Sequence, residues 1–413
     1  MKRFKVFLNE MIRHQKKWFG QWHTWAGIFA GSVLIVVSTT GSLLVFEEEL
    51  DVWLNPTLFD YPKEEKRLSF QEVHNLLIRN HPEFDIHGIY RMPNRNDCYQ
   101  VALEDFEQAI VNPYNGEVTG TRFYNSSTMG IIRNLHRTLL LGTFGKYMVG
   151  ICSLFMVILM ITGLRLWIPK KWSKLKESLT VKKGASFKRQ NYDLHNSMGF
   201  YFSPFITLIS LTGAAITFSP LVVLTLFLAS FEPPKSIDEI LGSPSEFYEG
   251  AQTLSIAEIE RIALEEEPDF EFMGLTYPHD SIGTFGANMV GEGRAATGDF
   301  TIVNLDQYSG KVVMNVNDLP NLGKVYANWV TPIHYGTFGG LTTRIIALIT
   351  TLMVPVLFIS GFIIWWGRWK KLKSQKARNK DAKAIIDQKE EDNVMNEIYE
   401  DELVLQSKGG LTQ

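Results

Sequence analysis

The sequence predicts an α-helical integral membrane protein with four transmembrane helices, arranged as two parallel repeats related by a pseudo-twofold axis, and with two small α+β modules outside the membrane. Three observations predict this fold. Apolar residues are concentrated in four runs of membrane-spanning length. Lysine and arginine gather at one end of each run, which indicates its orientation. The two long polar stretches share the same order of predicted elements, which indicates a duplication.

The composition limits the kinds of site that the chain can hold. The 413 residues have a formal net charge of -3, but the basic residues gather in the tails and the central loop, while the two long polar stretches lean acidic. The two cysteines, Cys98 and Cys152, fall in a polar stretch and an apolar run. Neither a disulfide framework nor a thiolate metal site is expected, so redox chemistry here needs another group.

The first predicted span covers residues 23–48, and its orientation follows from its flanks. Residues 1–22 are rich in lysine and arginine, whereas the span ends in Glu47, Glu48 and Glu49. The run is longer than a signal-peptide core, and no small-residue cleavage pattern precedes its acidic end. We therefore expect an uncleaved span whose N-terminal flank lies in the cytoplasm.

The first outer module is predicted over residues 49–130. Ser69 and Glu72 have the spacing of a capping box, which predicts a helix that ends near His81. Short runs with strand composition follow it, and a turn rich in Asn, Pro and Gly leads into one more strand. These runs cover residues 88–92, 98–103, 108–112 and 118 onward.

The second and third spans are predicted at residues 131–168 and 193–230. The loop between them, residues 169–192, is strongly basic and is expected in the cytoplasm. The third span contains Pro204 and Pro220, so we expect kinks or local unwinding in it.

The second outer module, residues 231–330, repeats the first. Ser255 and Glu258 again have the spacing of a capping box. The fourth span follows at residues 331–368 and ends in basic residues, so the charged tail at 369–413 is expected in the cytoplasm as a helix or a disordered segment.

The spacing of histidines and glycines supports the duplication. One histidine of each half stands 18 residues before a glycine, and another stands 27 residues before a glycine. These pairs are His23 with Gly41, His195 with Gly213, His136 with Gly163, and His334 with Gly361. Because both halves begin in the cytoplasm, the repeats are expected to be parallel.

The predicted topology sorts these four histidines into two pairs. His23 and His195 stand at the start of outward spans, so they share a depth near the cytoplasmic face; we call them the inner pair. His136 and His334 stand at the start of inward spans, so they share a depth near the outer face; we call them the outer pair. Two imidazoles from facing helices can bind a haem iron from opposite sides, so we predict two bis-histidine haems.

Neighbouring residues suit this prediction. Glycines would let a flat ring approach a helix backbone, and cationic side chains would bind its propionates. The glycines are Gly27, Gly142, Gly145, Gly199, Gly336, Gly339 and Gly340, and the cations are Arg137, Lys146 and Arg344. Ordinary snorkelling side chains at the membrane interface account for these cations equally well.

Other roles for the histidines stay open. Each could be a structural residue of the membrane interface, and together they could form a proton relay. Zinc or copper is less suited, because two imidazoles alone make a poor zinc site and no carboxylate or thiolate lies nearby in sequence. His87 and His279 stand at equivalent places in the two modules and are candidates for a substrate site.

The sequence resembles the PepSY-associated transmembrane proteins, also called iron-regulated inner-membrane proteins, some of which are siderophore reductases. The resemblance covers about residues 15–375. It rests on short motifs around each histidine and on the PepSY-like pattern of the two modules. These are Trp22-His23 with Trp25 and Gly27, Leu135-His136-Arg137, Leu194-His195-Asn196, and residues 68–118 and 254–313.

The resemblance implies a protein of the bacterial inner membrane, with periplasmic modules and haem, that passes electrons to a ferric siderophore or iron chelate and releases Fe(II). The chain shows no dinucleotide fingerprint or flavin-domain pattern, so a quinol or a separate reductase must donate the electrons. We expect membrane lipid around the spans and no nucleic-acid partner. The Gly-rich stretch from Gly283 to Gly298 departs from the family pattern, so the sequence does not indicate which surface binds the substrate.

Two other functions stay open at this stage. The modules could bind or regulate a partner protein or peptidase, with the spans serving as an anchor. A transporter is also possible, since repeats and proline-broken helices occur in such folds, although four spans are few for that.

Overall fold

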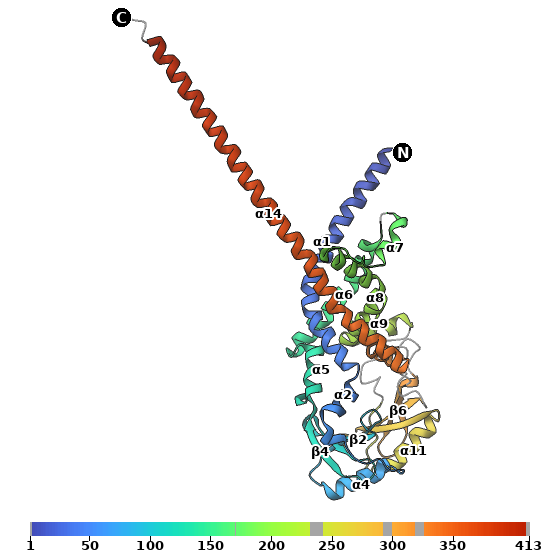
Figure 1. The fold of residues 1–413 in the computed structure, drawn as a ribbon. Helices are drawn as coiled ribbons and strands as arrows, with labels where there is room; N and C mark the ends of the chain where they lie inside the picture. Colours follow the sequence, from blue (N-terminus) through green and yellow to red (C-terminus); the bar gives the residue numbers. More distant parts are fainter. Residues whose placement is uncertain (1, 170, 232–242, 292–299, 319–325, 410–413) are drawn as a thin grey trace.

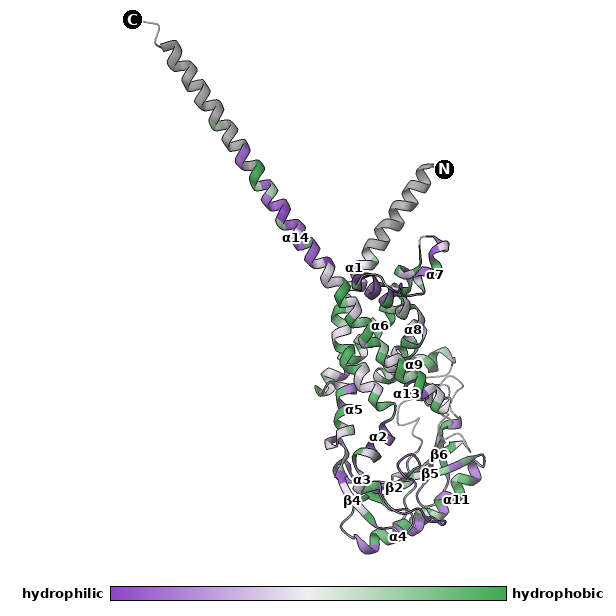
Figure 2. Ribbon diagram, in the orientation of Figure 1, coloured by the Kyte–Doolittle hydropathy of each residue, from purple (hydrophilic) through white to green (hydrophobic). Residues whose placement is uncertain are grey.

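The computed structural model describes residues 2–169, 171–231, 243–291, 300–318 and 326–409. Four of its helices contain a segment long and apolar enough to cross a membrane. These segments are Trp18–Leu44 in α1 (Lys2–Leu44), Gly142–Trp167, which is all of α6, Phe187–Thr217, which is all of α8, and Gly340–Ile386 in α14 (Gly340–Gly409). The chain is therefore a multi-pass membrane protein, and Figure 2 shows the apolar band that these helices form.

The four long helices form a bundle in which each contacts two neighbours. Helix α1 packs against α6 and α14, and α8 packs against the same two helices. Helices α1 and α8 therefore lie across the bundle from each other. The bundle core contains side chains from all four, among them Leu34, Met156, Ile206 and Val354.

Short helices join the bundle to the rest of the chain. Helix α8 ends at Thr217, and Pro220 stands in the first turn of the next helix, so the predicted local unwinding occurs near Pro220. Pro204, by contrast, lies inside the continuous α8. The short helices and turns are α2 (Glu47–Leu54), α3 (Pro56–Phe59), η2 (Tyr124–Ser126), α5 (Thr128–Thr138), η3 (Trp172–Lys174), α7 (Leu175–Ser178), α9 (Ser219–Ala229), η4 (Val316–Asp318), η5 (Tyr326–Val330) and α13 (Thr331–Tyr335).

At one end of the bundle lies a sheet, and both chain termini lie at the other end (Figure 1). The sheet has eight antiparallel strands in the order β4-β3-β2-β1-β5-β6-β7-β8, so each half of the chain contributes four. The strands are β1 (Ile86–Met92), β2 (Cys98–Leu103), β3 (Glu107–Val111), β4 (Val118–Phe123), β5 (Phe270–Thr276), β6 (Thr284–Gly291), β7 (Phe300–Asp306) and β8 (Val312–Asn315); η1 (Glu104–Phe106) lies between β2 and β3.

Both predicted capping boxes are confirmed. Ser69 caps α4 (Phe70–Asn80) and exchanges hydrogen bonds with Glu72, and Ser255 does the same with Glu258 at the start of α11 (Ile256–Glu266). In each half the capped helix covers the sheet, and four strands follow it.

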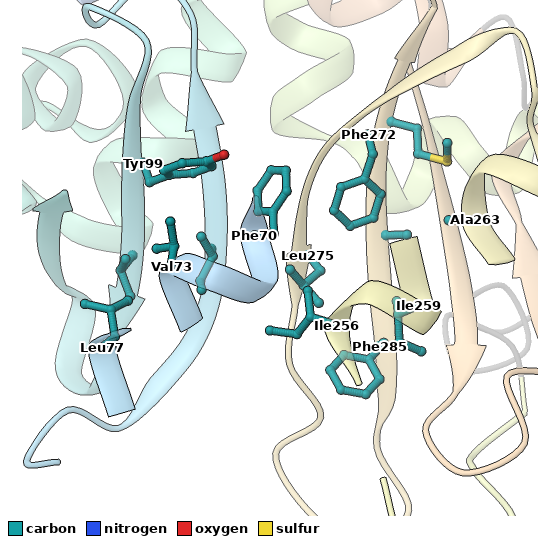
Figure 3. Packing of buried hydrophobic residues seen from close by; sticks show 14 of the residues in the cluster. Phe70, Val73, Leu77, Tyr99, Ile256, Ile259, Ala263, Phe272, Leu275 and Phe285 are labelled. Carbon is teal, nitrogen blue, oxygen red and sulfur yellow. The ribbon is translucent and has the colours of Figure 1, made fainter. Parts of the chain in front are cut away.

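The two predicted modules share one sheet and one core. Strand β1 pairs with β5, and Phe70 of α4 lies 5.0 Å, centroid to centroid, from both Tyr99 and Phe272 (Figure 3). At this seam a Cβ atom on Gly274, whose φ is +147°, would collide with the Ile89 carbonyl. The pairing of β1 with β5 gives hydrogen-bond partners to backbone N–H and C=O groups that would otherwise be unpaired at one edge of each module.

Part of the Gly-rich stretch from Gly283 to Gly298 is accounted for by this sheet. Residues Thr284–Gly291 form β6, which pairs with both β5 and β7. The remainder, residues 292–298, lies outside the described residues.

Candidate functional site

The structure brings together the two histidines of each predicted pair. In the inner pair, the ring centroids of His23 on α1 and His195 on α8 are 6.5 Å apart, and the ring planes are 82° apart. In the outer pair, the corresponding values for His136 on α5 and His334 on α13 are 6.2 Å and 48°. Both pairs are formed by residues that are far apart in sequence and meet across the bundle.

Each of these imidazoles lies against a glycine of a neighbouring helix. Placing a Cβ atom on the glycine shows how close the ring is. That atom would lie 3.1 Å from His23 Cε1 at Gly163, 3.0 Å from His195 Cε1 at Gly361, 2.9 Å from His136 Cε1 at Gly41, and 2.9 Å from His334 Cε1 at Gly213. We call these four residues the seat glycines. They are the glycines of the 18- and 27-residue spacings, which sequence reasoning used only as a sign of duplication.

The helix that carries each seat glycine also binds the imidazole through hydrogen bonds at Nδ1. The acceptors are a backbone carbonyl four residues before the glycine and the hydroxyl of the Thr or Ser just before it. His136 bonds to Val37 O (2.8 Å), His195 to Leu357 O (3.1 Å) and Ser360 Oγ (3.0 Å), His334 to Ile209 O (3.0 Å) and Thr212 Oγ1 (3.2 Å), and His23 to Thr162 Oγ1 (3.0 Å).

This arrangement suits the binding of one metal ion between the two rings of a pair. With Nδ1 engaged, Nε2 remains as the candidate ligand atom of each ring. Two imidazoles that bind one ion from opposite sides through bonds of about 2 Å have ring centroids about 6 Å apart. The inner and outer pairs, at 6.5 and 6.2 Å, meet this requirement. Among the described residues no cluster of three or more His, Cys, Asp or Glu side chains could hold a metal.

The predicted cationic residues lie in different surroundings. Arg344 donates to Glu49 at 2.6 and 2.7 Å and to the Val45 carbonyl at 2.8 and 3.1 Å, and it lies over the Phe46 ring. Its donors are therefore already engaged. Arg137 and Lys146 have exposed side chains, which leaves both able to reach an anionic group.

The glycines predicted to admit a flat ring contact other groups. A Cβ atom at Gly27 or Gly199 would lie 3.7 Å from a leucine of the adjacent helix, which is an ordinary packing distance. Gly145 and Gly336 allow close approach to neighbouring helical residues. Gly142 and Gly340 are the first residues of α6 and α14, have positive φ, and would place a Cβ atom in open space. Gly339 lies next to Thr343.

A buried ionic cluster, which sequence reasoning missed, joins α2 to the sheet and to α5. Asp51 is fully buried and accepts two hydrogen bonds of 2.7 Å from Arg122 of β4, and Arg95 lies 3.0 Å from it. Glu47 accepts from Tyr124 and from Arg133, which stands three residues before His136. The cluster therefore fixes the position of α5 and its histidine relative to the sheet.

A cavity of about 690 Å³ lies on the face of the sheet opposite α11. It is lined by polar side chains such as Asn288 and His279 and by apolar ones such as Ile302. His279 is 4.8 Å from His87, ring centroid to ring centroid, so the two candidate substrate-site histidines also come together.

Beside this cavity, His74 and Tyr277 form a hydrogen bond of 2.8 Å between the two halves. Burial lowers the pKa of His74 and raises the pKa of Tyr277. Both side chains are therefore neutral at neutral pH, and their bond fixes one wall of the cavity.

A second cavity, of about 440 Å³, lies between the end of α6 and the first turns of α8. It is lined by Asp193 and Asn196, which are close in sequence to His195, and by Trp167, four residues after the seat glycine Gly163. Lys171 and Lys174 also line it.

Comparison with known proteins gives one family match. The model of the PepSY-associated TM region matches residues 20–368. No curated protein matches the chain.

Proposed function

The chain belongs to the PepSY-associated transmembrane family, and we propose that it is a haem-containing electron-transfer protein that reduces a ferric siderophore or a related iron chelate and thereby releases Fe(II). The observation that carries this proposal is the presence of two facing histidine pairs, each with ring centroids 6.2 to 6.5 Å apart. A protein that only anchors a partner-binding domain has no need for such pairs.

We propose one haem b for each pair, bound by His23 with His195 and by His136 with His334. Haem iron with two imidazole ligands supplies a one-electron carrier that cycles between the ferric and ferrous forms. The histidines supply Nε2, the seat glycines keep each ring close to its neighbouring helix, and the apolar bundle core excludes water. Arg137 and Lys146 are the better candidates for propionate partners, because Arg344 is engaged with Glu49.

The positions of the two pairs support a path across the membrane. His23 lies near the start of the apolar segment Trp18–Leu44, whereas His136 packs on Gly41 near the end of the same segment. A membrane has an apolar core about 30 Å thick, so two carriers divide this distance into shorter steps. We propose a bacterial inner-membrane location, with the termini in the cytoplasm and the sheet in the periplasm.

The acceptor is proposed to bind in the 690 Å³ cavity on the sheet. Its volume lies within the range of about 300 to 1,000 Å³ that small-ligand sites have. Its lining offers amide, hydroxyl and imidazole groups together with apolar ones, which suits a chelate with polar ligand atoms and an apolar frame.

The electron donor, a quinol or a separate reductase, is proposed to act at the inner pair. The 440 Å³ cavity, lined by residues of α8 close in sequence to His195, gives a small donor access to that end of the bundle. Its aromatic residues, Trp167 and Tyr192, offer faces against which a planar ring can lie.

Reoxidation of the reduced protein tests this function. The detergent-purified chain is reduced chemically, the excess reductant is removed, and a ferric hydroxamate or catecholate chelate is added while the haem spectrum and the Fe(II) captured by a ferrous-specific dye are followed. We expect one Fe(II) for each electron that the protein loses, and no reoxidation with the iron-free chelator. A haem protein that no ferric chelate reoxidises would refute the proposed substrate class, and a haem-free protein would favour the anchor function.

A further inference from the structure

The hydroxyl groups next to the seat glycines have only one way to bond to the histidines. A hydroxyl has a single proton, and each of these donates it within its own helix. Thr162 Oγ1 donates to Ile158 O (2.8 Å), Thr212 Oγ1 to Leu208 O (2.9 Å), and Ser360 Oγ to Leu357 O (3.1 Å). While its proton is used in this way, each hydroxyl acts as an acceptor toward the imidazole.

The other partners of Nδ1 are backbone carbonyls, which are also only acceptors. His136, His195 and His334 face such carbonyls at 2.8 to 3.1 Å. Because a carbonyl can only accept, Nδ1 of His136, His195 and His334 carries the proton. At His23 the acceptor is Thr162 Oγ1, which has Ile158 O within its own helix as the acceptor for its proton. In a neutral imidazole the other nitrogen, Nε2, then holds the free lone pair.

We infer that Thr162, Thr212 and Ser360 are positioning residues of the two histidine pairs: their hydroxyls hold the imidazoles of His23, His334 and His195 in the Nδ1-protonated form and fix the ring orientation that presents Nε2. This inference rests on the proposed function for its effect on haem, but the protonation state itself exists without haem. Hydrogen-bonded outer partners of this kind also raise the basicity of a ligating imidazole.

The chain contains a natural comparison for this role. Thr40 stands before the seat glycine Gly41, as Thr212 stands before Gly213. Both hydroxyls lie near two carbonyls of their own helix, at 2.8 and 2.9 Å from Val36 O and Val37 O for Thr40, and at 2.9 and 3.0 Å from Leu208 O and Ile209 O for Thr212. Among the described residues no hydrogen bond joins Thr40 to His136, whose Nδ1 donates to the Val37 carbonyl. The outer pair therefore has one histidine with a hydroxyl partner and one without.

Thr212→Val and Thr40→Val, which keep the side-chain shape, test the inference at the outer pair. We expect Thr212→Val to raise the midpoint potential of the outer haem, because a less basic ligand favours Fe(II), and to weaken haem retention by about tenfold. Thr40→Val should change neither, and Thr212→Ser should restore both. Equal potentials for the two valine variants would overturn the inference.

The inner pair provides a second test. Ser360→Ala and Thr162→Val should shift the potential of the inner haem, whereas Ser153→Ala, which removes a buried hydroxyl of α6 that bonds only within its helix, should not. A purely structural role would lower the thermal stability of all three and leave the potentials unchanged.

A measurement on the haem-free protein separates this inference from the proposed function. The nitrogen chemical shifts of ¹⁵N-histidine, assigned through single His→Gln variants, report which ring nitrogen carries the proton. We expect Nδ1 protonation at His23, His136, His195 and His334. Nε2 protonation at His195 or His334 would overturn the inference even if the protein binds two haems, whereas Nδ1 protonation in a protein that never binds haem would refute only the proposed function.

Discussion

The inner and outer pairs have similar ring separations and seat glycines but are held by different parts of the chain. His23 and His195 lie within long, continuous helices that form the bundle. His136 and His334 lie on α5 and α13, which are short helices separated from the spans by left-handed residues, among them Leu139 (φ 50°) and Gly336 (φ 73°). The inner pair is therefore fixed by helix packing, whereas the outer pair also depends on what holds these short helices.

The sheet side of the molecule supplies that support. Arg133 on α5 bonds to Glu47 in the ionic cluster, and Arg344 near the start of α14 bonds to Glu49 of the same helix α2. Both contacts lie close in sequence to an outer histidine. A disturbance of α2 should therefore reach the outer pair and leave the inner pair intact.

Removal of one histidine from either pair should have the largest effect. We expect His23→Ala and His334→Ala each to remove about half of the bound haem, because each destroys one pair and leaves the other. Haem absorbance per protein measures this, and His81→Ala, just after the C-terminal end of α4, serves as control. Loss of all haem from either variant would contradict the independence of the two pairs.

A methyl group at a seat glycine should have the next largest effect. Gly163→Ala places a Cβ atom 3.1 Å from His23 Cε1, so the ring must shift, and we expect weaker binding of the inner haem only. Gly27→Ala, in the same pair of helices, meets Leu159 at an ordinary 3.7 Å and should bind haem as the unmodified chain does. Indistinguishable variants would show that Gly163 does not seat the histidine.

Disruption of the ionic cluster should disturb the outer histidine pair, which the cluster supports, and leave the inner pair unchanged. Asp51→Asn removes a fully buried charge and leaves Arg122, whose side chain is 10% exposed, without its charged partner; breaking a buried pair typically costs about 3 to 5 kcal/mol. We expect a lower melting temperature and a disturbed outer haem, seen in its optical and electron paramagnetic resonance signals. Glu48→Gln, at a half-buried α2 carboxylate outside the cluster, should change neither. Equal disturbance of both haems by Asp51→Asn would contradict the separate supports.

The smallest effect concerns pH. Burial alone would raise the pKa of Glu49. The hydrogen bond and the charge of Arg344 lower the pKa by more than burial raises it, so in the folded chain it lies below its usual 4.5. A lowered pKa means that this pair stabilises the fold above pH 4.5 and that the contribution is lost as the pH falls through the lower folded value.

The half-exposed Glu49–Arg344 pair should contribute about 1 kcal/mol or less to the free energy of unfolding. We expect acid to weaken the outer haem signal before the inner one, and Glu49→Gln to show the weakened signal already at neutral pH. If the outer haem signal of Glu49→Gln depends on pH as that of the unmodified chain does, the Glu49–Arg344 pair does not support the outer site.

The sequence predicts elements whose cause is local. Ser69 and Glu72 specify a helix start on their own, and the strands after α4 follow from alternating composition and turn residues. The histidine pairs were predicted from topology, since helices of the same direction place equivalent residues at the same depth. That reasoning needs no knowledge of contacts.

Contacts between distant segments could not be predicted in the same way. The joining of the two modules depends on the close approach of Gly274 to Ile89. The break before α6 depends on Leu139 and Leu140, whose residue type rarely adopts a left-handed conformation. The ionic cluster combines residues from Glu47 to Arg133. The seat glycines did leave a signal, the repeated spacings, but spacing alone does not reveal which helix each glycine faces.

The haem content of the unmodified chain tests the central claim most directly. The protein is purified from cells supplied with haem precursor, and its pyridine haemochrome spectrum is compared with its concentration from amino-acid analysis. We predict b-type haem with a haem-to-protein ratio near two. A ratio near one would mean that one pair has another role, and a ratio near zero would contradict the account.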